Sequence, residues 1–196
     1  MTTSLRCGRF VLTLDAPRII GIVNVTDDYF SGDGLAAPAQ QAVEQGRRMV
    51  AEGAHLLDIG GESSRPGADP VSADVELQRV IPVIEGLRDC GVPLSVDTMK
   101  PHVMRAAIAA GADMINDINA LQAPGALDAL HGSTVAVCLM HMRGEPRTMQ
   151  QAPAYTDVVS EVKYHLAQRV AVAEAAGIGR ERIVLDPGFG FGKTLE

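Results

Sequence analysis

Short apolar runs alternate along the chain with longer stretches in which apolar residues recur at helical spacing. The runs are rich in branched residues, as expected for strands buried on both faces of a parallel sheet. They predict strands at 18–25, 55–59, 93–97, 113–118, 134–140 and 182–186, and helices at 38–52, 73–89, 101–110, 123–131 and 156–176. Residues 5–14, ahead of the first strand, predict a small hairpin around Gly8.

Strict alternation of strands and helices fits both an open doubly wound sheet and a closed barrel. The ends of the strands favour an α/β fold of the TIM (β/α)₈ barrel type, because barrel active sites are built from the carboxyl ends of several strands. No G-x-G-x-x-G stretch follows the first strand, as a dinucleotide-binding fold would often show. Nearly every predicted strand ends in a polar residue: Asn24, Asp58, Asp97, Asn116, His141 and Asp186.

A complete barrel has eight strands and typically about 250 residues. The 196 residues supply about six βα units after the hairpin. We therefore expect residues 1–196 to be a single barrel domain whose C-terminal βα units are missing.

Charge, cysteine spacing and the length of the apolar runs argue against a nucleic-acid-binding, a disulfide-rich and a membrane-spanning protein. The net charge is −7, with no tryptophan and no Lys/Arg cluster, which argues against a nucleic-acid partner. Cys7, Cys90 and Cys138 are widely spaced, which argues against a disulfide framework or a cysteine zinc site and fits a reducing cytoplasm. No apolar run approaches the roughly 20 residues of a membrane span, and residues 1–9 lack the apolar core of an export signal. We expect a cytoplasmic protein without a membrane partner.

The polar residues at the strand ends predict a binding site. Carboxylates accept hydrogen bonds and amides both donate and accept, so together they suit a heterocycle with alternating donors and acceptors. For any single aspartate the alternative is that it binds its own backbone in a turn. For His141 we favour a satisfied histidine that lines the barrel mouth. The predicted set is Asn24, Asp58, Asp97, Asn116, Asp117 and Asp186.

Two glycine-containing stretches follow strands. Residues 58–67 (DIGGESSRPG) predict a shaped polar loop, with an ordinary strand-to-helix connection as the alternative. Residues 186–194 (DPGFGFGKT) lack the spacing of a nucleotide phosphate loop, because Pro187 stands five residues before Gly192. Lys193 and the neighbouring glycine amides remain candidates for contact with an anion.

The histidines are scattered, so the sequence predicts no tight metal site. A weakly held Mg²⁺ shared with a substrate's phosphates needs only one or two oxygen ligands, and Asn24 is a candidate for one.

Six blocks of sequence, in order and at matching spacing, resemble the dihydropteroate synthase family. The resemblance extends from about residue 18 to the end. It implies a TIM barrel, a homodimer when full length, and a reaction that joins 6-hydroxymethyl-7,8-dihydropterin diphosphate to p-aminobenzoate with Mg²⁺, releasing pyrophosphate. It also implies competition by sulfonamides for the p-aminobenzoate position. The blocks are NVTDDYFS (24–31), DIGGESSRPG (58–67), SVDT (95–98), INDI (115–118), LMHM (139–142) and DPGFGFGK (186–193).

Carried over position by position, the resemblance implies roles for individual residues. Asp97, Asn116 and Asp186 would bind the pterin and carry the catalysis, and Met140 would pack on the pterin ring. Asn24 would contact Mg²⁺ and pyrophosphate. The residues around p-aminobenzoate would be Phe30, Ser64, Arg65, Pro66 and Phe191.

The chain departs from the family pattern in the first loop, where Asp27 and Tyr29 replace the usual Pro and Ser. Ser64 replaces the usual threonine but keeps its hydroxyl group. The family's lysine on the seventh strand and its Arg-x-His on the eighth would lie after Glu196, so we expect this chain alone to be inactive. Two alternatives stay open, a non-catalytic pterin-binding paralogue and a corrinoid-linked methyltetrahydrofolate methyltransferase.

Overall fold

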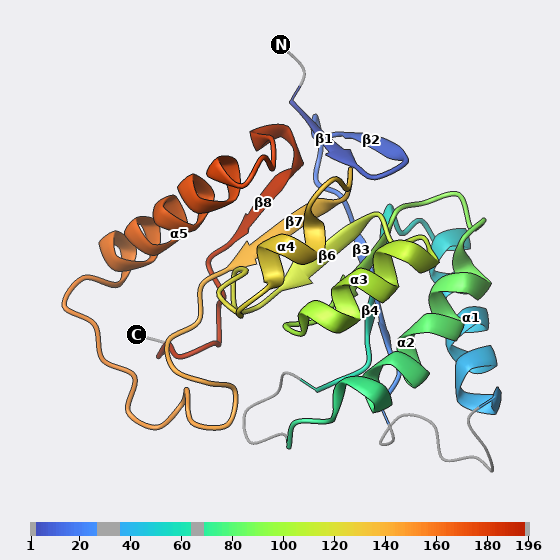
Figure 1. Cartoon of the computed structure of the whole chain (residues 1–196), viewed down its shortest axis with the longest axis horizontal. Coiled ribbons are helices and arrows are strands. Elements are labelled where there is room, and N and C mark those ends of the chain that lie inside the picture. Colours follow the sequence, from blue (N-terminus) through green and yellow to red (C-terminus); the bar gives the residue numbers. More distant parts are fainter. Residues whose placement is uncertain (1–2, 27–35, 64–68, 195–196) are drawn as a thin grey trace.

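The computed structural model describes residues 3–26, 36–63 and 69–194. Within them, the predicted strands and helices are confirmed, with ends that differ by a few residues (Figure 1). The strands are β1 Ser4–Cys7, β2 Phe10–Thr13, β3 Ile20–Asn24, β4 Leu56–Gly60, β5 Leu94–Asp97, β6 Met114–Asp117, β7 Ala136–Met140 and β8 Ile183–Asp186. The helices are α1 Ala36–Ala51, α2 Ala73–Leu87, α3 Pro101–Ala110, α4 Ala126–Leu130 and α5 Val158–Ala175, with a 3₁₀ turn η1 at Arg180–Arg182. None of the helices in this part of the chain has the length and apolar character needed to cross a bilayer.

The order of the strands distinguishes between the two sheet architectures. Strands β3 to β8 pair in parallel, each beside the next one in sequence. A doubly wound sheet reverses its strand order at a switch point, whereas a barrel keeps sequential neighbours all the way round. The observed order is that of a (β/α)₈ barrel.

The two faces of the sheet bury different residues. The outer face packs against the helices, and its side chains include Leu57, Ile59, Val96, Ile115 and Leu139. The inner face carries a second apolar cluster, in which Leu56, Met114 and Ala136 meet Leu5 and Cys7 of the hairpin. In Figure 1 the hairpin lies at the opposite end of the sheet from the long connection that follows β7. The hairpin therefore fills the inner face at the amino ends of the strands, and the carboxyl ends remain for other groups.

Two helices begin as their sequences predict. The hydroxyl of Ser72 accepts a hydrogen bond from the backbone N–H of Val75 at 3.3 Å and caps α2. Pro101 occupies the first turn of α3, where a missing N–H costs nothing. Lys100 precedes it as N-cap without a side-chain cap bond, which leaves its ammonium group for other partners.

Asp113 ties the hairpin to the sheet. Its side chain is 1% exposed and accepts hydrogen bonds from the backbone N–H of Arg9 at 3.0 Å, from Arg9 Nε at 2.9 Å and from Leu94 N–H at 3.1 Å. Gly8 makes the approach possible, because it has a φ of +55° and a Cβ there would lie 2.5 Å from Asp113 Oδ1. The turn of the hairpin therefore requires glycine.

We predict that Asp113→Ala lowers the free energy of unfolding by about 2 to 4 kcal/mol, because the change leaves the Leu94 N–H and the Arg9 guanidinium without their buried acceptor. Urea unfolding of the full-length protein measures the loss. Glu174→Ala is the control, since it breaks an exposed ion pair with Arg180 and is expected to cost no more than about 1 kcal/mol. Equal losses in the two variants would contradict the role of Asp113.

Candidate functional site

Polar side chains from several strands converge at the carboxyl end of the sheet. Asp97 on β5 and Asn116 on β6 are direct cross-strand partners, and Met140 on β7 pairs with Asp186 on β8. Gly60 pairs with Asn24 on one side and Asp97 on the other. The sequence prediction that these residues share one end of one sheet is confirmed.

Gly60 keeps space open between Asn24 and Asp97. A Cβ built at this position would lie 3.7 Å from Asn24 Oδ1, 3.9 Å from Asp97 Cβ and 4.0 Å from the carbonyl oxygen of Glu62. Two oxygens and the Cβ of Asp97 therefore border a spot that no side chain of β4 fills.

Asp58 orients the amide of Asn116. Asn116 Nδ2 donates a hydrogen bond of 3.0 Å to Asp58 Oδ2. Because a carboxylate only accepts, the amide nitrogen faces Asp58 and the amide oxygen is left for another donor. Asp58 Oδ1 is buried and has no hydrogen-bond partner among the described residues. Burial raises the pKa of Asp58, and hydrogen bonds from Ser95 and Asn116 oppose that rise.

Asp97 is the most perturbed carboxyl group at the mouth. Burial raises its pKa well above the ordinary value, and the negative charges of Asp58, Glu76, Asp117 and Glu62 add to the rise. A ligand that brings N–H donors or positive charge to Asp97 would favour its ionised form. The site therefore suits an electron-poor or cationic group with hydrogen-bond donors.

Asp117 does not belong to this mouth, so its place in the predicted set was wrong. Its side chain is fully buried and accepts hydrogen bonds of 2.8 Å from the backbone N–H groups of Asn119 and Leu121. Side chains alternate along β6, so Asp117 faces the opposite side of the sheet from Asn116. It binds the backbone of its own turn, which was the alternative for any single aspartate. Burial raises the pKa of Asp117 to about 6, and those two hydrogen bonds limit the rise.

Lys193 does not offer its ammonium group to an external anion. Nζ donates to the carbonyl oxygens of Gly188, Phe191 and His141 at 2.9, 3.0 and 3.1 Å, and it lies 3.0 Å from His141 Nδ1. The sequence offers Lys193 only as a candidate for contact with an anion, and these protein contacts engage its ammonium group. Burial and the nearby Lys193 charge lower the pKa of His141 to about 4, so the ring is neutral at pH 7. His141 is a satisfied histidine, as the favoured interpretation held.

The remaining predicted site residues are placed as follows. Met140 is buried at the end of β7, and Phe191 is partly exposed in the loop after β8, where its N–H donates to the carbonyl of Gly188. Asp186 Oδ1 accepts from the N–H of Gly188 at 2.7 Å. Phe30, Ser64, Arg65 and Pro66 lie outside the described residues.

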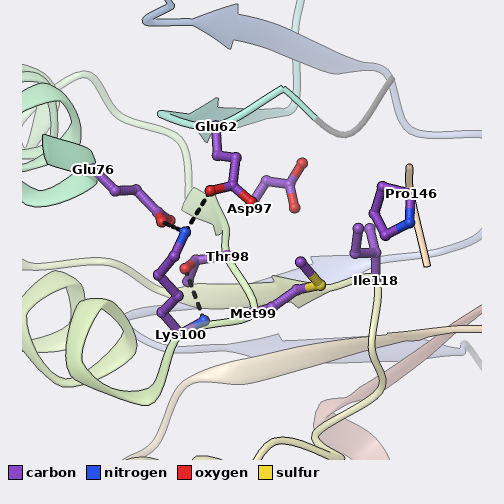
Figure 2. Close-up of a pocket in the computed structure, with 8 residues that line it drawn as sticks. All are labelled: Glu62, Glu76, Asp97, Thr98, Met99, Lys100, Ile118 and Pro146. Atoms are coloured by element: carbon purple, nitrogen blue, oxygen red, sulfur yellow. Dashed lines mark hydrogen bonds and ion pairs between the residues drawn. The ribbon is translucent and has the colours of Figure 1, made fainter. Parts of the chain in front are cut away.

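One charged cluster at the mouth was missed. Lys100 Nζ lies 2.5 Å from Glu62 Oε2 and 2.5 Å from Glu76 Oε2, next to Asp97 (Figure 2). Glu76 lies in the first turn of α2, where the helix dipole favours an acid, but its side chain is fully buried. The available signal was spacing, because Glu76 stands four and seven residues before the buried Val80 and Val83.

The described residues contain no group of three or more His, Cys, Asp or Glu side chains placed to hold a metal ion. A cation at this mouth would need ligands of another kind, and Asn24 offers an amide oxygen.

The sequence and the structure were compared with known proteins. The family model "Pterin binding enzyme" matches residues 20–196. The chain belongs to the pterin binding enzyme family.

Its relatives in this family include dihydropteroate synthases. The chain is 50% identical to the enzyme of Escherichia coli K12 over 185 residues, which cover 94% of the chain and 66% of that relative. A structure of the Xanthomonas albilineans enzyme with 4-aminobenzoic acid superposes with a TM-score of 0.90 at 55% identity, covering 99% of the chain and 69% of the other. The Burkholderia cenocepacia enzyme complexed with 7,8-dihydropteroate gives 0.88 at 52% identity, covering 98% and 66%. The match confirms the barrel fold, and the chain spans about two thirds of the length of these relatives.

The raised pKa of Asp97 predicts an effect on stability in this pterin binding enzyme. A carboxyl whose pKa is higher in the folded state destabilises the fold at pH values above that pKa, and the penalty fades as the pH falls and the group is protonated. Asp97→Asn removes the titration, so the variant should be more stable than the wild type at pH 7.5, by a margin that shrinks at pH 5. Urea unfolding of the full-length proteins at both pH values measures the margin. A gain that is independent of pH, or a loss at pH 7.5, would contradict this account.

Proposed function

We propose that the full-length protein is a dihydropteroate synthase, which condenses 6-hydroxymethyl-7,8-dihydropterin diphosphate with p-aminobenzoate to give 7,8-dihydropteroate and pyrophosphate in folate synthesis. The observation that carries the proposal is the pair Asp97 and Asn116, cross-strand partners at the mouth of the barrel, with the Asn116 amide oriented by Asp58. Identities of about half to dihydropteroate synthases support it. The proposal treats residues 1–196 as one pterin-binding domain.

The pterin offers amino and ring N–H donors as well as acceptors. In the proposal, Asp97 and Asp186 accept hydrogen bonds from the pterin, and Asn116 accepts through its amide oxygen. Met140 supplies the apolar surface on which the ring packs. Asp97, Asn116 and Asp186 are therefore the proposed catalytic residues.

In the reaction, the amine nitrogen of p-aminobenzoate bonds to the exocyclic methylene carbon of the pterin. The bond from that carbon to the diphosphate oxygen breaks, its electron pair leaves with pyrophosphate, and the amine loses a proton. If the leaving group departs first, positive charge develops on the pterin. Contact with the pterin's donors and with the developing positive charge favours the carboxylate form of Asp97, and that carboxylate in turn stabilises the charge.

The second substrate is assigned to the outer part of the mouth. Phe191 lies in the loop after β8, beside the Lys193 contacts, and forms one side of the proposed p-aminobenzoate position. Phe30, Ser64, Arg65 and Pro66 complete it by resemblance alone. The 4-aminobenzoic acid in the Xanthomonas structure supports this class of ligand.

Mg²⁺ is assigned to Asn24. Mg²⁺ prefers hard oxygen ligands and usually keeps several waters while sharing the substrate's phosphates. The amide oxygen of Asn24 fits that requirement, and Gly60 leaves the space beside it unfilled. When bound, the ion would offset the negative charge of the diphosphate. The proposal also includes a homodimer and a cytoplasmic location.

The direct test is conversion of labelled p-aminobenzoate to dihydropteroate by the full-length protein, with pterin diphosphate and Mg²⁺. Product formation is expected, because the two departures from the family pattern in the first loop, Asp27 and Tyr29, are not among the residues assigned to the pterin site. Absence of product with pterin still bound would indicate a non-catalytic pterin-binding paralogue. Methyl transfer from methyltetrahydrofolate to a corrinoid would indicate the methyltransferase instead.

We predict that Asp97→Asn and Asn116→Ala each weaken pterin binding roughly 10- to 100-fold, the range expected when a hydrogen bond to a charged or buried group is lost. Calorimetry with the full-length protein measures the affinity. Asp128→Asn, at an exposed aspartate on α4, is the control and should bind as the wild type does. Unchanged affinity in both site variants would overturn the assignment of this pair.

A further inference from the structure

Lys100, Glu62 and Glu76 form a partly buried ionic cluster that joins three segments of the chain. Glu62 lies just after β4, Glu76 in the first turn of α2, and Lys100 between β5 and α3. Lys100 Nζ is 2.5 Å from one carboxylate oxygen of each glutamate. Figure 2 shows the ammonium group between the two carboxylates, with Asp97 on the side of Glu62.

Stability alone does not account for this arrangement. Glu76 is buried, while the side chains of Glu62 and Lys100 are 15% and 25% exposed, so the cluster loses much of its hydration and the attraction between its charges often fails to offset that cost. Two carboxylates face one ammonium group, so the cluster keeps a net negative charge. In addition, Glu76 Oε1 is buried without a hydrogen-bond partner among the described residues.

The cluster links the two residues that form the base of the β4–α2 connection, Glu62 and Val71. Glu62 Oε2 also accepts the backbone N–H of Val71 at 2.9 Å, so residues 62 and 71 are joined through one side chain. Arg79 Nη1 donates to the carbonyl of Gly61 at 2.8 Å on the same connection. Lys100 therefore binds the carboxylate of Glu62, and the same carboxylate binds the N–H of Val71 near the other end of this connection.

The cluster is also attached to the end of β5. The backbone N–H of Lys100 donates to Thr98 Oγ1 at 3.2 Å, and the N–H of Thr98 donates to the carbonyl of Asn116 at 3.0 Å. Asp97 is the residue directly before Thr98. Hence Lys100 fixes the β4–α2 connection relative to the two strand ends that carry Asp97 and Asn116.

The charges of the cluster act on Asp97 as well. Glu76 and Glu62 are among the groups that raise the pKa of Asp97. Burial alone would lower the pKa of Lys100, but its hydrogen bonds to Glu62 and Glu76 outweigh that and raise it. Lys100 is therefore charged at neutral pH and is the counter-charge of both glutamates.

We propose that Lys100 is a positioning residue, which clamps the base of the β4–α2 connection to the end of β5 through Glu62 and Glu76 and thereby sets the geometry and charge around Asp97. The consequence for pterin binding rests on the function proposed above. The clamp itself does not, since it can be measured without substrate.

The first test is hydrogen exchange of the Val71 amide in the substrate-free full-length protein. Lys100→Met keeps the length and apolar stem of the side chain but removes the charge, so Val71 should exchange at least about 10-fold faster while Val96 in β5 is unaffected. Lys100→Arg should restore much of the protection. Arg180→Met, which removes a surface ion pair with Glu174, is the control. Unchanged Val71 exchange in Lys100→Met would overturn the clamp.

The second test separates positioning from a merely structural role. In Lys100→Met, kcat/KM for pterin diphosphate should fall about 10- to 100-fold with an unchanged circular dichroism spectrum. Glu62→Gln keeps an acceptor for Val71 and Lys100 but removes a negative charge beside Asp97, which lowers the pKa of Asp97. The pH below which pterin binding is lost should therefore move to lower values in that variant.

Faster Val71 exchange with wild-type kinetics in Lys100→Met, or an unshifted pH profile in Glu62→Gln, would overturn the positioning role. A wild-type protein that makes no product would overturn the synthase proposal alone, because Val71 exchange still decides whether the clamp exists.

Discussion

The inner face of the sheet has to change from apolar to polar within strands of only four or five residues. At the amino ends, Leu56, Met114 and Ala136 are sealed by the hairpin. Two positions further along β6, Asn116 already faces a polar mouth. Because side chains alternate with a period of two, a slip of one residue would place charged groups among the helices and apolar groups in the mouth. The register that buries the core is therefore the register that assembles the site.

The fold was predictable because its signals are local. Run length, branched residues and polar strand ends mark each βα unit, and the caps at Ser72 and Pro101 mark helix starts. The error at Asp117 was avoidable, since Asn116 and Asp117 are adjacent in a strand and have to face opposite sides. The direction of Lys193 was not predictable, because it depends on a loop in which three glycines take positive φ values. The partners of Lys100 are 24 and 38 residues away in sequence, and only the packing of α2 against the sheet brings them together.

The mouth concentrates acidic groups before any ligand arrives. Asp58 and Asp97 share one end of the sheet, and Glu62 and Glu76 stand close by with Lys100 as their counter-charge. The raised pKa of Asp97 means that its ionised form lowers the stability of the free protein. A ligand that supplies donors or positive charge relieves that cost on binding. Stability and function thus make opposite demands on Asp97, as is common at binding sites.

The hairpin has a consequence for the order in which the molecule is assembled. Its residues are synthesised before those of the six-stranded sheet, yet the contact of Arg9 with Asp113 spans 104 positions, and Leu5 and Cys7 pack against strands that extend to Ala136. Contacts between such distant segments form late, since closing a long loop has an entropic cost that is repaid only when the partners are in place. The hairpin therefore leaves the ribosome before the six-stranded sheet but packs against the inner face of that sheet only after β7 has formed. Until then Leu5 and Cys7 lack the partners that bury them in the folded protein, so the segment is open to aggregation while the rest of the sheet is being made.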